Sequence, residues 1–254
     1  MAIGSDPIVA TTSVSGATCA GVHAVLQAGG KGTRLHPATV TVPKPLLKVG
    51  GMPMVERLLR QLANSGVRMV SVIVGWHGEQ VERHLNNLRG LPSDLHLNFI
   101  RETSPMGNIG ALSLLPPSSA PVLFAFGDLL TDLDFCELLA VHKQLGGAAT
   151  LASHYENHQL TLGELQVRDT QVVDYQEKPL KKFLICSGIA VFEPEVVRLL
   201  DPTRPSGIST LIQAALAERL LVRHWLHGAF WMDINTPEAL EIAEKQTASR
   251  PLTA

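Results

Sequence analysis

Residues 22–47 read VHAVLQAGGKGTRLHPATVTVPKPLL, a stretch in which an apolar run is followed by glycines and basic residues. An apolar run ends at Ala28 and passes directly into three glycines, with Lys31, Arg34 and Lys44 close by. Glycine lets a backbone approach a ligand closely, and a row of exposed N–H groups makes an anion site. The pattern therefore indicates a buried strand that leads into a polyphosphate-binding loop. A surface turn with solvated cations is the alternative, because a glycine-rich loop alone is weak evidence.

The segments after this loop alternate between strands and helices. We predict strands over residues 69–75, 95–102 and 121–128, and helices over 53–66, 79–90, 110–115 and 135–147, the last capped by Asp132 or Asp134. This alternation predicts a parallel sheet covered on both faces, with a ligand crevice at the carboxyl ends of the strands. The expected class is α/β, with a Rossmann-like, mixed but mostly parallel sheet flanked by helices.

The pattern changes from about residue 148. Strands without intervening helices are predicted over 148–155, 163–169, 171–179 and 183–192, which indicates a smaller antiparallel subregion for a substrate. Helices follow over 193–200, 209–220 and 236–246, the last with Thr236 as its N-cap. We expect residues 1–20 to be a flexible leader and 21–254 a single domain, with a nucleotide half over 21–147 and a substrate half over 148–254.

Composition narrows the classes of function. The formal net charge of -2 argues against nonspecific nucleic-acid binding, and no apolar run is long enough for a membrane span. The three cysteines, at positions 19, 136 and 186, form neither a CxxC pair nor an even disulfide framework. A reducing cytoplasm is therefore the expected location.

Two aspartates stand where ligands bind in such sheets. Asp128 ends the strand PVLFAFGD, and Asp233 lies in FWMDINTPE just before a helix. If both converge at the carboxyl edge, they can hold Mg²⁺, which prefers a few carboxylates together with substrate phosphate oxygens. Taken singly, each aspartate can equally be a turn or helix cap.

Several motifs in order resemble the sugar-phosphate nucleotidyltransferases, also called nucleoside-diphosphate-sugar pyrophosphorylases. The signature is AGGKGTRLHPATVTVPKPLLKVGGMPM over residues 28–54, and SPMGNIGAL, FGD, EKP, SGIAVF and WMDINTPEAL follow, so the resemblance covers residues 22–245. The sequence is similar to the short mannose- and heptose-1-phosphate guanylyltransferases. This resemblance implies a glycosyltransferase-A-like nucleotidyltransferase fold. Some relatives continue into a left-handed β-helix acyltransferase domain, so we expect a catalytic domain alone.

The resemblance implies a reaction of a nucleoside triphosphate with a sugar 1-phosphate, giving a nucleotide sugar and pyrophosphate, with Mg²⁺ as cofactor. It implies catalytic roles for Arg34 at the pyrophosphate, Lys44 at the α-phosphate and Lys178 at the sugar phosphate, and a metal site at Asp128 and Asp233. The implied nucleotide-binding residues are Ala28, Gly29, Gly30, Lys31, Gly32, Thr33, Glu102 and Gly107. The implied sugar-phosphate residues are Gly163, Glu177, Cys186, Ser187 and Gly188.

Glu102 indicates the base. In the family a glutamine often stands there and both donates to and accepts from a pyrimidine, whereas an ionised glutamate only accepts. Guanine presents two adjacent donors, so we expect GTP. The alternative is that Glu102 is a carboxylate at a strand end that faces water.

The sugar side departs from the family pattern. The segment CSGIA lacks the asparagine and tyrosine that relatives often carry near Cys186 and Ala190, which favours a heptose or cyclitol phosphate over a standard hexose. The alternatives are a uridylyl-, thymidylyl- or cytidylyltransferase of the same fold, and an inactive subunit that binds nucleotide sugar and regulates a partner. A homodimer also stays open, and neither nucleic acid nor membrane is expected as a partner.

Overall fold

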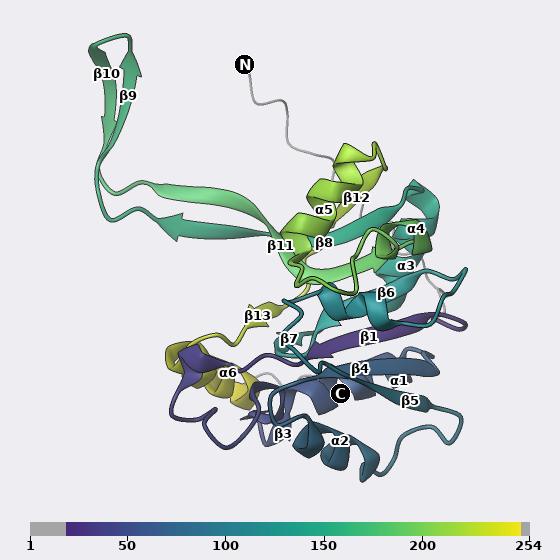
Figure 1. The fold of residues 1–254 in the computed structure, drawn as a ribbon. Helices are drawn as coiled ribbons and strands as arrows, with labels where there is room; N and C mark the ends of the chain where they lie inside the picture. Colours follow the sequence, from purple (N-terminus) through teal and green to yellow (C-terminus); the bar gives the residue numbers. More distant parts are fainter. Residues whose placement is uncertain (1–18, 250–254) are drawn as a thin grey trace.

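A seven-stranded sheet forms the centre of the protein, which we describe from a computed structural model for residues 19–249. The strand order is β12-β8-β11-β6-β1-β4-β5. β1, β4, β5 and β6 run parallel, β11 is antiparallel to β6 and β8, and β12 is parallel to β8 (Figure 1). The bounds are β1 His23–Ala28, β4 Met69–Val74, β5 His96–Arg101, β6 Val122–Phe126, β8 Ala149–Gln159, β11 Leu180–Phe192 and β12 Val222–Leu226. The mixed, mostly parallel α/β sheet is confirmed.

Helices cover both faces because side chains alternate along the buried strands. Ala24 and Leu26 of β1 belong to the core cluster that includes helices α1 to α3, whereas Val25 belongs to the cluster that includes η3, α4 and α5. The bounds are α1 Met54–Asn64, α2 Gly78–Asn86, η3 Gly110–Leu114, α3 Phe135–Leu145, α4 Pro194–Val197 and α5 Ile208–Ala217.

Most predicted elements are present, with local differences. The helix expected at 110–115 is the 3-10 helix η3, and the one expected at 193–200 is reduced to the short α4. Asp134 caps α3 by accepting from the backbone N–H groups of Cys136 and Glu137, while Asp132 accepts from the N–H of Phe230. Thr236 Oγ1 accepts from the N–H of Ala239 at the start of α6 (Pro237–Ser249), as predicted.

Three short two-stranded pairs complete the fold. β2 (Lys48–Val49) pairs with β3 (Met52–Pro53), and β7 (Leu129–Thr131) pairs with β13 (Trp231–Asp233). The third pair, β9 (Glu164–Arg168) and β10 (Gln171–Gln176), lies at the end of an arm that continues β8 and β11 beyond the body (Figure 1). The antiparallel strands predicted after residue 148 are therefore present, but their outer half projects from the molecule.

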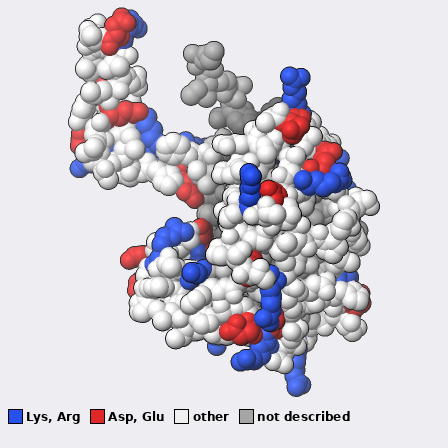
Figure 2. All heavy atoms as spheres, viewed as in Figure 1, with Lys and Arg blue, Asp and Glu red and all other residues white. Residues whose placement is uncertain are grey.

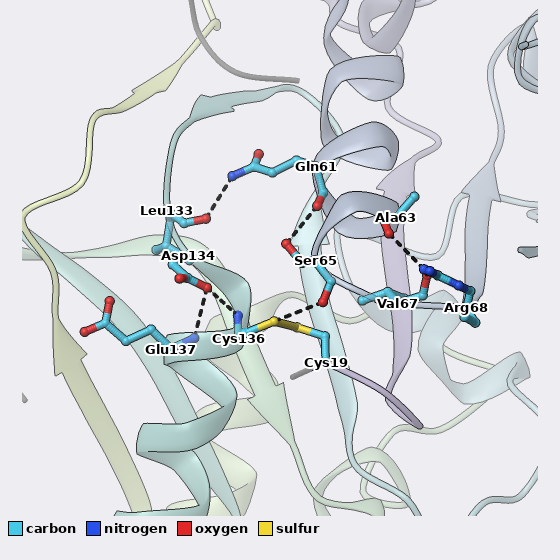
Figure 3. The surroundings of a disulfide bond; sticks show 10 residues. All are labelled: Cys19, Gln61, Ala63, Ser65, Val67, Arg68, Leu133, Asp134, Cys136 and Glu137. Atoms are coloured by element: carbon cyan, nitrogen blue, oxygen red, sulfur yellow. Dashed lines mark hydrogen bonds between the residues drawn. A yellow bond between two sulfur atoms is a disulfide. The ribbon is translucent and has the colours of Figure 1, made fainter. Parts of the chain in front are cut away.

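A disulfide joins Cys19, just before β1, to Cys136 in the first turn of α3 (Figure 3). The number and spacing of the cysteines did not indicate this pair, which leaves Cys186 as a free cysteine. The two residues are 117 positions apart, and their Cα atoms lie 5.1 Å apart only because α3 packs beside the entry to β1. No sequence spacing reveals such a tertiary pairing. Most of the leader expected over residues 1–20 lies outside the described residues. Within residues 19–249, no helix is long and apolar enough to cross a bilayer.

Candidate active site

The two segments that carry the main candidate residues meet at one edge of the sheet. β1 and β6 are parallel neighbours with Gln27 opposite Phe126, so both chains leave the sheet at the same end. The N–H of Gly127 donates to the carbonyl of Gln27 over 2.8 Å, which ties the two exits together. The glycine loop after β1 and Asp128 after β6 are therefore adjacent at the carboxyl edge, where open α/β sheets bind ligands.

An ionic cluster fills this edge, made of Lys44, Asp128, Asp233, Asn235 and Arg34. Lys44 Nζ donates to Asp128 Oδ2 over 2.5 Å and to Asn235 Oδ1 over 2.6 Å, and it lies 3.7 Å from Asp233 Oδ1. Arg34 Nη2 donates to Asn235 Oδ1 over 3.0 Å, and Asn235 Nδ2 donates to Asp233 Oδ2. The structure thus brings four predicted residues together, and the cluster combines cations with carboxylates as a site for a metal-bound polyphosphate requires.

The carboxyl group of Asp233 has a raised pKa and one buried oxygen without a hydrogen bond in the described part of the chain. Burial raises the pKa of its carboxyl group, as does the nearby charge of Asp128, while Lys44 and Arg34 oppose the shift. Oδ1 of Asp233 is buried and accepts no hydrogen bond from any residue between 19 and 249. An oxygen left in this state is costly unless a further cation or donor completes it.

The glycine loop positions Lys44. Gly32 has φ 61°, and a Cβ there would come within 2.9 Å of Lys44 Cβ and 3.1 Å of Thr39 Cγ2. Thr39 Oγ1 donates to the carbonyl of Gly32 over 2.7 Å. Lys44 itself begins the 3-10 helix η2 (Lys44–Leu46) between two prolines and is only 6% exposed. The glycine loop therefore packs against the aliphatic part of the Lys44 side chain and also borders the site.

A hollow of about 440 Å³ lies on the other side of the glycine loop. Its walls include five predicted nucleotide-binding residues, namely Gly29, Gly30, Lys31, Glu102 and Gly107. Glu102 reaches it from the end of β5; a Cβ at Gly29 would overlap its carboxylate, and its Oε1 accepts from the N–H of Met106 over 3.2 Å. Burial raises the pKa of Glu102, against the opposing effect of the Met106 N–H. Ala28 ends β1, and the exposed Thr33 begins the 3-10 helix η1 (Thr33–Leu35), which also carries Arg34 of the ionic cluster.

The predicted sugar-phosphate residues divide into two groups. Cys186, Ser187 and Gly188 lie at an irregularity in β11. Gly188 has φ 70°, and a Cβ there would meet the ring of Phe126. Ser187 is fully buried, and its Oγ lies 2.8 Å from both His154 Nδ1 and His227 Nε2, so its hydroxyl is already engaged. Cys186 is exposed.

The second group, Gly163, Glu177 and Lys178, lies on the arm. Tyr175 donates its hydroxyl to Glu177 over 2.5 Å, and a Cβ at Gly163 would overlap the Tyr175 ring. Lys178 is exposed, has φ 46°, and its carbonyl accepts from Gln159 Nε2. Within residues 19–249 no hydrogen bond or ion pair joins these three residues to the ionic cluster. Figure 2 shows the arm standing off the body above a lobe whose rim carries basic side chains.

Sequence reasoning missed several participants. Asn235 links Arg34, Lys44 and Asp233, yet its only signal was its place two residues after Asp233 in WMDINTPE. Trp76 and His77 line the hollow, with Lys31 Nζ 5.5 Å from the centre of the Trp76 ring. His154 and His227 surround Ser187 although no spacing in the sequence connects them.

A Rossmann-like sheet with a glycine loop, a hollow beside that loop and a cation–carboxylate cluster at the same edge is the arrangement expected of a site for a nucleoside polyphosphate. The chain belongs to the nucleotidyl transferase family, whose model matches residues 23–250. This finding confirms the family resemblance stated from the motifs.

Curated relatives include guanylyltransferases. The chain is 30% identical over 226 residues to the mannose-1-phosphate guanylyltransferase catalytic subunit beta of Drosophila pseudoobscura pseudoobscura and 30% identical over 220 residues to the mannose-1-phosphate guanyltransferase of Saccharomyces cerevisiae. These matches cover 86% and 83% of this chain and 60% of each relative. The chain thus spans about 60% of the length of these relatives.

Solved structures share the fold. A putative glucose-1-phosphate thymidylyltransferase from Bacillus anthracis superimposes with a TM-score of 0.70 at 20% identity, covering 89% of this chain and 94% of that one. HddC from Yersinia pseudotuberculosis, complexed with GMP-PN, gives a TM-score of 0.67 at 20% identity, covering 89% and 99%. At these identities the likeness supports the fold alone.

Proposed function

We propose that this chain joins a nucleoside triphosphate, with GTP favoured, to a sugar 1-phosphate and releases pyrophosphate. An oxygen of the sugar phosphate forms a bond to the α-phosphorus, and the bond from that phosphorus to the oxygen leading to the β-phosphate breaks. The observation that carries the proposal is the ionic cluster, in which Lys44 lies between Asp128 and Asp233 beside the glycine loop. The retained cations and carboxylates also argue against an inactive regulatory subunit.

The chain's own residues supply positioning and charge. Backbone N–H groups of the Gly29–Gly32 loop would hold the triphosphate, and Arg34 would face the departing pyrophosphate. Lys44 would neutralise charge at the α-phosphate. Its side chain is buried, which holds its ammonium group in one position. Such preorganised groups commonly contribute the largest share of catalysis in transfers of this kind.

Asp128 and Asp233 are the proposed holders of Mg²⁺. The buried Asp233 Oδ1 without a hydrogen-bond partner among the described residues fits a cation, and within residues 19–249 no group of three or more histidine, cysteine, aspartate or glutamate side chains forms a fuller site. Mg²⁺ is often held by one or two carboxylates with substrate phosphates completing its shell. When bound, the ion would neutralise phosphate charge and orient the triphosphate.

Glu102 supports guanine as the base. Its carboxylate lies in the wall of the hollow next to Gly29, where a base can follow from a triphosphate held in the loop. Guanine N1–H and N2–H₂ would donate to a carboxylate, whereas uracil and thymine would present a carbonyl to it. Because burial raises the pKa of Glu102, a donor edge would also favour its ionised form. The names of the curated relatives point to the same nucleotide and to mannose 1-phosphate.

The nucleotide assignment is tested by pyrophosphate release with GTP, UTP, dTTP, CTP and ATP against hexose, heptose and cyclitol 1-phosphates in the presence of Mg²⁺. We expect GTP to lead, and E102Q to lose selectivity for GTP by about tenfold or more. The matched control is E137Q in the first turn of α3, outside the lining of the hollow, which should leave the selectivity unchanged. A lead for UTP or dTTP would reject the guanine assignment but keep the enzyme class, and silence in every mixture would favour a regulatory subunit.

The sugar phosphate is proposed to meet Lys178 and Glu177 at the bend of the arm, together with the exposed Cys186 and the backbone of Gly188. Ser187 is buried with its hydroxyl held by His154 and His227, so it would support this segment and not contact the sugar itself. Both arm residues are exposed and outside the ionic cluster in this structure, so the bend must approach the body for Lys178 to act. K178A should raise the KM for sugar 1-phosphate with little change in the KM for GTP. Equal effects on both constants would remove Lys178 from the sugar subsite.

The cytoplasm is the proposed location, since nucleoside triphosphates are available there. The Cys19–Cys136 disulfide is unusual for a reducing compartment and counts against this location.

A further inference from the structure

Trp76 is an exposed tryptophan in the wall of the hollow that also carries Glu102. Its side chain is 39% exposed, whereas Trp225 is buried and Trp231 is half-buried. An indole ring combines a large apolar face with a polar edge, and such rings are enriched where a protein meets a ligand or a partner. None of the roles proposed for the glycine loop, Glu102 or the ionic cluster uses this ring.

The sheet places Trp76 between two predicted nucleotide-binding segments. β4 lies between β1 and β5, and the three strands run parallel. The glycine loop follows β1, Trp76 follows β4, and Glu102 follows β5. The N–H of Trp76 donates to the carbonyl of Gly29 over 3.2 Å, and the N–H of Glu102 donates to the carbonyl of Val74 over 2.9 Å. The hollow is therefore lined by three neighbouring strand exits, with Trp76 on the middle one.

A tight turn holds the backbone of Trp76 against the glycine loop. A Cβ at Gly75 would come within 2.7 Å of the Gly29 carbonyl oxygen and 3.0 Å of Glu102 Oε2. The N–H of Gly78 donates to the carbonyl of Gly75 over 3.0 Å, and His77 within this turn has φ 50°. Residues other than glycine rarely adopt such a φ, and those that do cluster at ligand and active sites.

The present neighbours of the ring are compatible with an arriving base. Lys31 Nζ lies 5.5 Å from the centre of the Trp76 ring, and the His77 ring lies 4.4 Å away at an angle of 55°. Lys31 is exposed, and a cation–π contact at an exposed site is weak. A base can therefore replace the Lys31 ammonium group, which is then free to face the phosphates held by the glycine loop.

Stacking and edge recognition select a base by different properties. In the described part of the chain, Trp76 and His77 carry the only aromatic rings in the wall of the hollow. Every base has a face that can stack on an aromatic ring, so stacking tolerates any base. The two fused rings of a purine cover more of an indole than the single ring of a pyrimidine. Glu102, in contrast, would distinguish bases by the donors on their edges.

We propose that the base of the nucleotide stacks on Trp76, so that Trp76 favours purines over pyrimidines while Glu102 favours guanine over adenine. The inference rests on the proposed nucleotidyl transfer, because that reaction places a triphosphate in the adjacent glycine loop. Trp76 would contact the base and not the reacting phosphorus. Its loss should therefore weaken nucleotide binding and raise the KM for GTP, with little effect on kcat.

The test is nucleotide binding by calorimetry with Mg²⁺ and without sugar phosphate, so that no turnover is involved. We expect W76A to weaken the binding of GTP and ATP alike by about tenfold or more, to weaken UTP less, and W76F to keep most of the affinity. The matched control is F183A, which removes another exposed aromatic ring outside the lining of the hollow and should change none of the three constants. Thermal unfolding checks that each variant is folded.

Tryptophan fluorescence gives a second readout, because contact with a stacked base quenches an indole. GTP should quench the wild type, and at saturation it should also quench E102Q, which keeps the ring. W76F should show no quenching, since Trp225 and Trp231 lie outside the hollow.

The outcomes separate this inference from the proposed reaction. Equal GTP affinity in W76A and wild type, or quenching that persists in W76F, would overturn stacking on Trp76 and leave the proposed transfer standing. Equal losses for GTP and UTP in W76A would overturn the preference for purines. A wild type that binds none of the three nucleotides would overturn both the inference and the proposed function.

Discussion

Replacing Lys44 by methionine keeps the length of the apolar stem and removes the charge from the ionic cluster. Lys44 is 6% exposed, and its Nζ contacts Asp128 at 2.5 Å and Asn235 at 2.6 Å. Removing one partner of a buried pair costs about 3–5 kcal/mol. The side chains of Asp128 and Asp233 are 27% and 33% exposed, so water offsets part of this loss, and we expect K44M to lose about 2 kcal/mol of unfolding free energy.

The loss in K44M should depend on pH. The pKa of Asp233 is already raised by burial and by Asp128, and Lys44 opposes that shift. Without Lys44 the folded carboxyl binds its proton still more tightly than the unfolded one, so stability falls as pH rises through the folded-state pKa. The difference between K44M and wild type should therefore be full at neutral pH and shrink as the pH falls into the acidic range.

Urea denaturation at several pH values measures this difference, with K143M on the exposed side of α3 as the control. The kcat of K44M should fall by about 10²–10³-fold, because the Lys44 cation is proposed to act on charge that develops during the reaction. This loss is larger than the loss of unfolding free energy alone would cause. A K44M protein with unchanged stability at all pH values, or with kcat within a few-fold of wild type, would refute the reasoning.

Three further perturbations follow from the structure. G32A forces alanine into φ 61° with its Cβ 2.9 Å from Lys44 Cβ, so it should lose about 1–3 kcal/mol in urea denaturation, whereas G30A, whose Cβ meets nothing within 4 Å, should keep its stability. C136S removes the link to Cys19 across 117 positions and should lose about 2–5 kcal/mol, with C186S unchanged; equal unfolding midpoints for C136S and wild type would contradict the disulfide. Burial and the charge of His154 lower the pKa of His227 to about 4, so stability should decline as pH falls from about 6.5 to 4, by at most about 3 kcal/mol, and H227Q should flatten this decline. A parallel decline in H227Q and wild type would assign it to other groups.

Local patterns predicted much of the fold. The apolar run before the glycines became β1, and the amphipathic repeat after Pro53 became α1, because both depend on neighbours in the sequence. β12 was missed: His224 and Arg223 give it a mixed polar pattern, and it forms by parallel pairing with β8 at the sheet edge. Edge strands of this kind depend on a distant partner more than on their own composition.

The candidate site was predictable where motifs place residues at strand ends. Asp128 follows β6, and the pairing of β13 with β7 places Asp233 opposite Leu129, the next residue after Asp128. Lys44, in η2, contacts both carboxylates. The Cys19–Cys136 disulfide, the histidines around Ser187 and the Asn235 bridge require coordinates, since each joins segments far apart in the chain. The direction of the arm could not be predicted either. Strand periodicity predicts that β9 pairs with β10, but it does not indicate where the hairpin lies relative to the body.

The proposed reaction is tested most directly by chromatographic detection of a GDP-sugar formed from GTP and mannose 1-phosphate or a heptose 1-phosphate with Mg²⁺. The comparison is between the wild type, K44M and D233N. We predict product from the wild type and a loss of about 10²-fold or more in both variants, with the sum of GTP and GDP-sugar conserved. Equal product from K44M, D233N and wild type would contradict the assignment of chemistry to the ionic cluster.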